Sequence, residues 1–252
     1  MIRPGRCLWQ PCLSGRKRSR PSGPVSRHGM MAAMTAPTAA AIRPVQALLV
    51  VDVQAAFVSG WEAVPDADRV LRCTRDLLSR ARAAGALVVH LQNDGEPGAV
   101  DAPHTPGWEL HLPVEPGPRE RVVRKTEDDG FADTPLGDLL TDAGVTELAV
   151  CGVLSEMCVA ATARTALVRG HRVVLPHDAH ATYDIPAAPG ISDTVPAAMS
   201  SRAAEWALGD EVEIVPHAAA VPFAAAPRPA VGPAAAPGLP VSPAAPPPSP
   251  VR

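Results

Sequence analysis

The sequence predicts an α/β fold, a three-layer α/β/α arrangement around a six-stranded, mainly parallel sheet. Two observations support this prediction. Through the middle of the chain, short apolar runs alternate with longer segments of helical periodicity, and repeated strand–helix alternation is typical of parallel sheets. The apolar runs at 46–51 (QALLVV) and 86–91 (ALVVHL) are continuous rather than alternating, as expected for strands that helices cover on both faces.

The elements follow one another at the spacing that this fold requires. A helix over 66–84 carries apolar residues at helical intervals and is ended by Gly85, and a second helix over 135–143 is ended by Gly144. Right-handed crossovers then place helices on both faces of the sheet, in a Rossmann-like arrangement. The expected strands are 46–51, 86–91, 121–124, 147–151, 171–175 and 211–215, with further helices from about 157 and over 194–208.

Composition restricts the class of protein. The 252 residues are 46% hydrophobic and 19% charged, which is enough for one sizeable domain with a buried core. No apolar run approaches the ~20 residues that a membrane-spanning helix needs, so no membrane partner is expected. The 5 cysteines are scattered and form no C-x-x-C pair, which favours neither a disulfide framework nor a zinc cluster and makes the reduced cytoplasm the expected location.

The two ends of the chain differ from its middle. Residues 1–44 hold no acidic residue and eight Lys or Arg, and we expect a disordered basic extension. It is a transit peptide, a polyanion-binding segment or, the interpretation we favour, an over-extended start ahead of a later methionine. Residues 216–252 are Ala/Pro-rich and are expected to form a disordered tail. The domain between them, 45–215, holds all 26 acidic residues but only 13 of the 23 basic ones, which argues against a nucleic-acid partner.

Reactive side chains follow three of the expected strands. Asp52 ends the first strand, Lys125 ends the third, and Cys158 follows the fourth at the start of a helix, where the helix N-terminus favours a thiolate. Ligands of open α/β sheets bind at the carboxyl ends of the strands, so we expect these side chains to converge. They supply a proton acceptor, a cation and a nucleophile, which suffice for acyl transfer. Each also has an ordinary structural interpretation, as a turn cap, a solvated lysine and a buried cysteine.

Several segments, taken in order, carry a family pattern: LLVVDVQAAF, HLQNDG, TPGWELH, VVRKTEDDGFADTPL, VCGVLSEMCVAATARTALVRG and VVLPHDAHAT. With them the chain resembles, over the domain between its tails, the isochorismatase-like cysteine hydrolases, which include nicotinamidases, N-carbamoylsarcosine amidases and ureidoacrylate-type amidohydrolases. The resemblance implies a catalytic triad of Asp52, Lys125 and Cys158. It also implies a cis peptide bond between Val153 and Leu154, with the backbone N–H groups of Leu154 and Cys158 forming an oxyanion hole.

The resemblance further implies the reaction. The sulfur attacks the carbonyl carbon of a small amide, lactam or ureido substrate, a thioester forms, and water cleaves it without any cofactor. The substrate pocket is expected around Gln54, Phe57, Trp108 and Phe131. Assembly into a homo-oligomer is expected from the family as well. The alternative is a catalytically inactive relative that serves as a binding or scaffold protein.

Departures from the family pattern narrow the expected chemistry. The metal site of nicotinamidases begins with Asp-x-His after the second strand. That region reads HLQNDG here, and His104 and His111 do not complete an evident three-ligand set, so no metal is expected. True isochorismatases lack the nucleophilic cysteine, so Cys158 disfavours their vinyl-ether chemistry. A Cys–His dyad, with His90 or a histidine after the fifth strand, is the rival arrangement, and it is disfavoured because strand histidines are more often hydrogen-bonded core residues.

Overall fold

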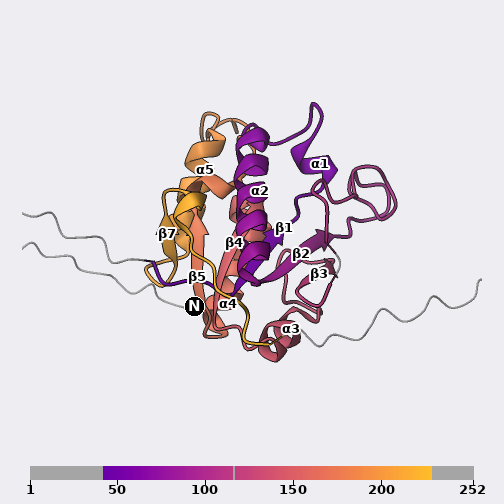
Figure 1. Cartoon of the computed structure of the whole chain (residues 1–252). Coiled ribbons are helices and arrows are strands. Elements are labelled where there is room, and N and C mark those ends of the chain that lie inside the picture. Colours follow the sequence, from indigo (N-terminus) through magenta and orange to yellow (C-terminus); the bar gives the residue numbers. More distant parts are fainter. Residues whose placement is uncertain (1–41, 116, 229–252) are drawn as a thin grey trace, which may run out of the picture. The chain divides into compact units, whose positions relative to one another are not determined.

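The computed structural model describes residues 42–115 and 117–228. These residues form a seven-stranded parallel sheet with the order β3-β2-β1-β4-β5-β7, and the short strand β6 pairs with the end of β4 (Figure 1). The strands are β1 (Ala47–Val51), β2 (Leu87–Asn93), β3 (Glu120–Lys125), β4 (Glu147–Val153), β5 (Arg172–Pro176), β6 (His180–Ala181) and β7 (Glu213–Val215). The helices are α1 (Ala55–Val58), α2 (Ala67–Ala84), α3 (Leu136–Asp142), α4 (Ala160–Val168) and α5 (Ala197–Ala207), with the short helical turns η1 (Ser155–Val159), η2 (His177–Ala179) and η3 (Ala218–Ala220).

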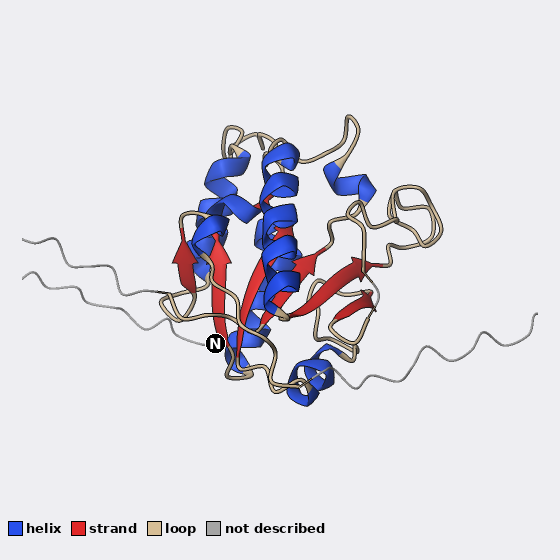
Figure 2. Ribbon diagram, viewed as in Figure 1, coloured by secondary structure: helices blue, strands red, loops and turns tan. Residues whose placement is uncertain are grey.

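Helices cover both faces of the sheet (Figure 2). Ala47, Leu49 and Val51 of β1 pack on one face together with residues of α3 and α4. Leu48 and Val50 point to the opposite face and pack with residues of α2. Because both faces of β1 are buried, every position of the strand is apolar. The prediction of a three-layer α/β/α fold is confirmed. The sheet contains one strand that the sequence did not predict, β6, because 2 residues are too few to show a strand periodicity.

The chain continues to contact the domain beyond the expected domain end at residue 215. The Val45 N–H donates to the Pro222 carbonyl oxygen at 2.9 Å, and the Ala224 N–H donates to the Val45 carbonyl oxygen at 2.9 Å. The alanine-rich segment that reaches residue 228 therefore packs as part of the domain, because its small apolar side chains fit closely against their neighbours. The rest of both expected extensions lies outside the described residues.

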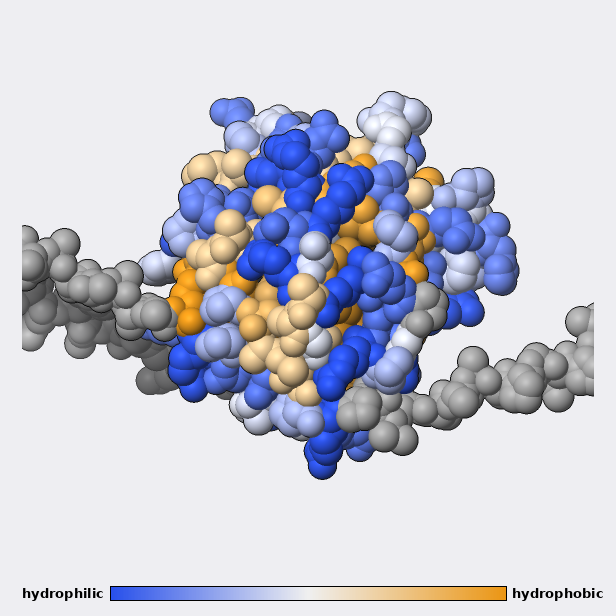
Figure 3. All heavy atoms as spheres, viewed as in Figure 1, coloured by the Kyte–Doolittle hydropathy of each residue, from blue (hydrophilic) through white to orange (hydrophobic). Residues whose placement is uncertain are grey.

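None of the helices in the described ranges is both long and apolar enough to cross a lipid bilayer. The α2 helix is amphipathic: residues such as Val70 and Leu77 are buried against the sheet, whereas Arg72 and Arg75 are exposed. The face of the molecule that α2 covers accordingly shows hydrophilic residues next to hydrophobic ones (Figure 3).

Candidate active site

Lys125 is the centre of the expected group of reactive side chains. Its Nζ lies 2.8 Å from Asp52 Oδ2 and 3.4 Å from Cys158 Sγ. The side chains of Lys125 and Asp52 are 0% and 3% exposed, so they form a buried ion pair. The structure therefore brings the three residues together, because the carboxyl ends of parallel strands share one edge of the sheet.

Two further groups hold the Lys125 ammonium group in place. It donates hydrogen bonds to Asn93 Oδ1 at 3.3 Å and to the backbone oxygen of Glu127 at 3.1 Å. Asn93 pairs with Lys125 in the register of β2 and β3, and its side-chain amide donates to Asp101 Oδ2 at 2.7 Å. Sequence reasoning missed Asn93. The available signal was its position at the end of β2, the strand that lies between β1 and β3.

The ends of β1 and β4 approach each other closely. Asp52 follows β1 with a φ of 49°, in the left-handed region that Asp tolerates better than most residues. Beside it, Gly152 has a φ of +122°, and a Cβ added there would lie 2.0 Å from the Val51 carbonyl oxygen, so only glycine fits. β4 ends in a cis peptide bond between Val153 and Leu154, at the position that the family resemblance implies. The buried Asp52 Oδ1 has no hydrogen-bond partner among the described residues, which leaves it available to accept a proton.

Cys158 lies in the π-helical turn η1, and the regular helix α4 begins after it. Met157 has φ −106° and ψ −107°, which are not helical values, so the helix expected from about residue 157 begins later than the sequence indicates. The turn presents the partly buried Cys158 sulfur to Lys125 and, at 3.5 Å, to Asp128 Oδ1. The sulfur therefore contacts both a cation and an exposed carboxylate.

The electrostatics of the site favour a thiol in the resting state. Burial and the nearby carboxylate of Asp52 raise the pKa of the Cys158 thiol, and Lys125 offsets only part of this shift. Burial also raises the pKa of Asp52, against the opposing effect of Lys125. Desolvation of the sulfur and the charge of Asp52 therefore act against the thiolate that the helix N-terminus is expected to favour. A thiol instead lies beside a carboxylate that is a stronger base than usual, which suits proton transfer between them.

The charge of Lys125 is maintained by its neighbours. Burial lowers the pKa of Lys125, but the negative charges that Asp52 and Cys158 can carry raise it more, so its pKa lies above the ordinary value. Lys125 is therefore an ammonium group whichever of its two partners holds the proton. It can stabilise a carboxylate before proton transfer and a thiolate after it.

Replacing Asp52 with Asn is expected to shift the alkylation of Cys158 by iodoacetamide to lower pH, because the amide removes a negative charge that raises the pKa of the thiol. The rate of Cys158 modification is measured against pH by peptide mass spectrometry. Asp128→Asn is the matched control: its carboxylate is 3.5 Å from the sulfur but has a smaller effect on the pKa, so the midpoint should move less. A midpoint that rises in Asp52→Asn, or that moves further in Asp128→Asn, contradicts this electrostatic account.

The histidines that follow or lie within the strands do not contact Cys158. His90 is buried inside β2, with its Nε2 hydrogen-bonded to a glutamate at 2.9 Å. His177 and His180 both contact Glu205. None of these imidazoles is a partner of the Cys158 sulfur in the part of the chain that the structure describes, so the geometry does not support a Cys–His dyad.

The four residues expected around the substrate pocket have different surroundings, and Trp108 donates its indole N–H to Asp94 Oδ1 at 2.8 Å. Gln54 is buried, and its amide donates to the backbone oxygens of Asn93 and Trp108, both at 2.9 Å, so it fixes the loop that carries Trp108. Phe131 packs inside the core, on the face of the sheet that α3 and α4 cover. Phe57 lines a cavity. Gln54 and Phe131 therefore support the site from within the domain rather than line an open pocket.

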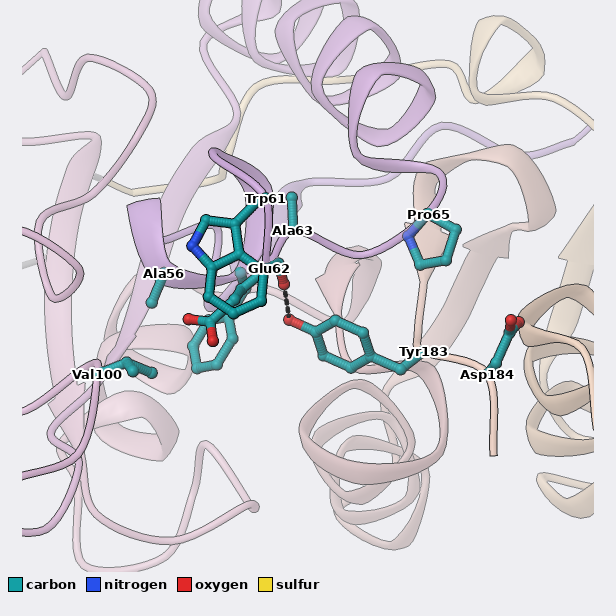
Figure 4. A pocket seen from close by; sticks show the side chains of 9 residues that line it. Ala56, Trp61, Glu62, Ala63, Pro65, Val100, Tyr183 and Asp184 are labelled. Carbon is teal, nitrogen blue, oxygen red and sulfur yellow. Dashed lines mark hydrogen bonds between the residues drawn. The ribbon is translucent and has the colours of Figure 1, made fainter. Parts of the chain in front are cut away.

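The cavity has a volume of about 550 Å³ and lies beside α1 (Figure 4). Phe57, Trp61 and Tyr183 line it, and the Tyr183 hydroxyl donates to the backbone oxygen of Glu62 at 2.8 Å. Glu62 and Asp184 add carboxylates to the lining. The cavity adjoins the edge of the sheet that carries the three reactive residues, because α1 follows β1 and β6 pairs with the end of β4. None of those three residues lines it, so it neighbours the reactive group without containing it.

Comparisons with known proteins agree with this architecture. The family model for the isochorismatase domain matches residues 46–190. Streptothricin hydrolase from Streptomyces noursei is 76% identical over 245 residues, which cover 90% of this chain and 89% of that protein. The ureidoacrylate amidohydrolase RutB from Methylobacterium radiotolerans is 28% identical over 191 residues, with 61% of this chain and 74% of that protein covered.

A solved structure shows the same fold. The crystal structure of an isochorismatase from Pseudomonas putida KT2440 superimposes with a TM-score of 0.64 at 28% sequence identity, and the match covers 71% of this chain and 93% of that one. The family model spans more than half of this chain, and the parallel sheet with helices on both faces is shared with the solved relative. The chain belongs to the isochorismatase family and is a hydrolase.

Proposed function

We propose that this protein hydrolyses the C–N bond of streptothricin or of a closely related small lactam, with Cys158 as the nucleophile. The observation that carries the proposal is the contact set around Lys125, where a carboxylate and a thiol meet one buried ammonium group. The 76% identity with streptothricin hydrolase supports the substrate class. The similarity to ureidoacrylate amidohydrolase supports hydrolysis of a C–N bond as the reaction.

The first half of the reaction forms a thioester. Asp52 takes the proton of the Cys158 thiol while the sulfur attacks the carbonyl carbon of the substrate. Lys125 stabilises the negative charge on either group. The N–H groups of Leu154 and Cys158 hold the tetrahedral oxyanion, and in a well-studied protease one such donor lowers the barrier by roughly 3–4 kcal/mol. The C–N bond then breaks, and Asp52 gives its proton to the departing nitrogen.

The second half releases the acid. Asp52, again a carboxylate, takes a proton from water, and the oxygen of that water attacks the thioester carbon. The sulfur leaves and recovers the proton from Asp52, which restores the starting state. A raised pKa suits Asp52 for this double role, because it must both accept and return a proton. A lactam product differs from its substrate by one water, since the ring nitrogen stays attached.

Acidic groups favour a substrate that carries positive charge. Glu62 and Asp184 line the neighbouring cavity, and Asp128 lies 3.5 Å from the Cys158 sulfur. Carboxylates at short range attract an ammonium group and repel a substrate that carries a carboxylate of its own. This contrast favours a basic lactam over an anionic substrate such as ureidoacrylate.

The test is to incubate the full-length protein with streptothricin, ureidoacrylate and nicotinamide and to follow each compound by liquid chromatography and mass spectrometry. We expect streptothricin to gain one water at least roughly tenfold faster than ureidoacrylate, a ratio that corresponds to about 1.4 kcal/mol between the two transition states. If ureidoacrylate is the faster substrate, the substrate assignment is wrong while the mechanism stands. If none of the three is hydrolysed and Cys158 forms no acyl adduct, the protein is a binding member of its family.

A further inference from the structure

A second cluster of ionisable side chains lies where η2, β6 and α5 meet. His177 Nδ1 is 2.6 Å from Glu205 Oε1, and His180 Nε2 is 3.0 Å from the same oxygen. The ligand atoms that these three residues can offer all lie within 4.8 Å of one another. Two imidazole nitrogens thus converge on one carboxylate oxygen, and the proposed hydrolysis uses none of the three residues.

We propose that His177, His180 and Glu205 bind one divalent transition-metal ion of the Zn²⁺ type, at a site separate from Cys158. Two imidazole nitrogens and one carboxylate oxygen form a ligand set that Zn²⁺ uses with a fourth position left to water. Tetrahedral Zn²⁺ with bonds of about 2.0–2.1 Å holds its ligand atoms roughly 3.3 Å apart. The separations of 2.6 and 3.0 Å to Glu205 Oε1 therefore need to widen only slightly. Imidazole ligands favour this class of ion over Mg²⁺ and Ca²⁺, which prefer oxygen.

Neighbouring groups already orient two of the three ligands. Ser155 Oγ lies 2.8 Å from His180 Nδ1, which directs the other ring nitrogen toward the centre of the cluster. Arg202 donates to Glu205 Oε2 at 3.2 Å and leaves Oε1 for the metal. Such outer partners fix the ring orientation and the protonated nitrogen of metal-binding histidines. An imidazole that binds a metal ion through Nε2 carries its proton on Nδ1, where Ser155 Oγ can accept the hydrogen bond.

Two residues of the cluster are buried and the third is exposed to solvent. The side chains of His180 and Glu205 are each 1% exposed, whereas that of His177 is 48% exposed. An ion can therefore enter past His177. Without an ion, the two imidazoles and Arg202 can satisfy the carboxylate by hydrogen bonds alone, and the experiment must distinguish this state from a metal site.

The experiment titrates the metal-free, full-length protein with Co²⁺ and follows visible absorption, with Zn²⁺ added afterwards as competitor. We expect one Co²⁺ per chain at this site, displacement by Zn²⁺, and no sulfur-to-metal charge-transfer band, which would report a cysteine ligand. In His177→Ala the Co²⁺ dissociation constant should rise at least roughly tenfold, since even outer partners of metal ligands contribute that much. His217→Ala is the matched control: it is another exposed histidine beside a carboxylate, 3.2 Å from Asp178 Oδ2, and its removal should leave the affinity unchanged.

Three outcomes overturn the proposal. They are the absence of any Co²⁺ spectrum, equal affinity in wild type and His177→Ala, and a band that shows thiolate coordination. Circular dichroism checks that each variant is folded. Both replaced histidines are exposed, so neither substitution is expected to unfold the protein, and a difference in affinity between the variants reports metal binding. Because the readout is binding, failure of the proposed hydrolysis leaves this test intact.

Discussion

Replacing Cys158 with Ala is expected to reduce kcat/KM at least roughly 10⁴-fold, because the side chain that would form the thioester is lost and only substrate binding and the backbone donors remain. The measurement is the rate of streptothricin hydrolysis, together with intact-mass analysis of protein quenched during turnover. Wild type should show an acyl adduct on Cys158, and the variant should show none. The fold should persist, since Cys158 is partly exposed and precedes α4 rather than filling the centre of the core.

The control for this prediction is Cys73→Ala. Cys73 is also a partly buried free cysteine, but it lies on α2 beside Asp178 and Arg69, not beside Asp52 and Lys125. Its removal should change kcat/KM by less than about twofold, because surface-proximal substitutions outside a site have small effects. Wild-type turnover in Cys158→Ala would exclude the covalent mechanism, and an equal loss in both variants would point to damage to the fold.

Replacing Lys125 with Met is expected to lower the free energy of unfolding by about 3–5 kcal/mol and to abolish hydrolysis. The side chains of Lys125 and Asp52 are both almost completely buried, so the substitution leaves the Asp52 carboxylate without its counter-ion in a site of low polarity. Urea denaturation measures the loss. Arg124→Met on the same strand is the matched control, since Arg124 is half exposed and pairs with Asp94 at the surface, where an ion pair contributes about 0–1 kcal/mol.

The double variant Asp52→Asn, Lys125→Met separates stability from catalysis. Without either charge, no ion is left buried alone, so we expect much of the lost stability to return while hydrolysis remains absent. Recovery of both properties would show that the ion pair has no catalytic role. A Lys125→Met variant that is no less stable than Arg124→Met would show that the pair is not buried in solution.

The sequence by itself determined the fold class, because the apolar patterns of strands and helices are local. The run at 46–51 matches β1 (Ala47–Val51), and Gly85 ends α2 where expected, with a left-handed φ of 71°. It also located the reactive group, since Asp52 and Lys125 each occupy a strand end and parallel strands bring those ends to one edge. Once the strands were placed, the parallel topology of the sheet was enough to predict that these side chains lie close together.

Only the tertiary structure decided which way the side chains point and how deeply each one is buried. The sequence predicted that Phe131 and Gln54 line the substrate pocket, but both side chains are buried inside the domain. The pKa of Cys158 is raised by burial and by the charge of Asp52, against the effect of Lys125, and these groups come from separate parts of the chain. The cluster of His177, His180 and Glu205 exists because α5 packs beside β6. These properties arise from contacts between residues far apart in the chain, and local patterns do not encode the distances on which desolvation and coordination depend.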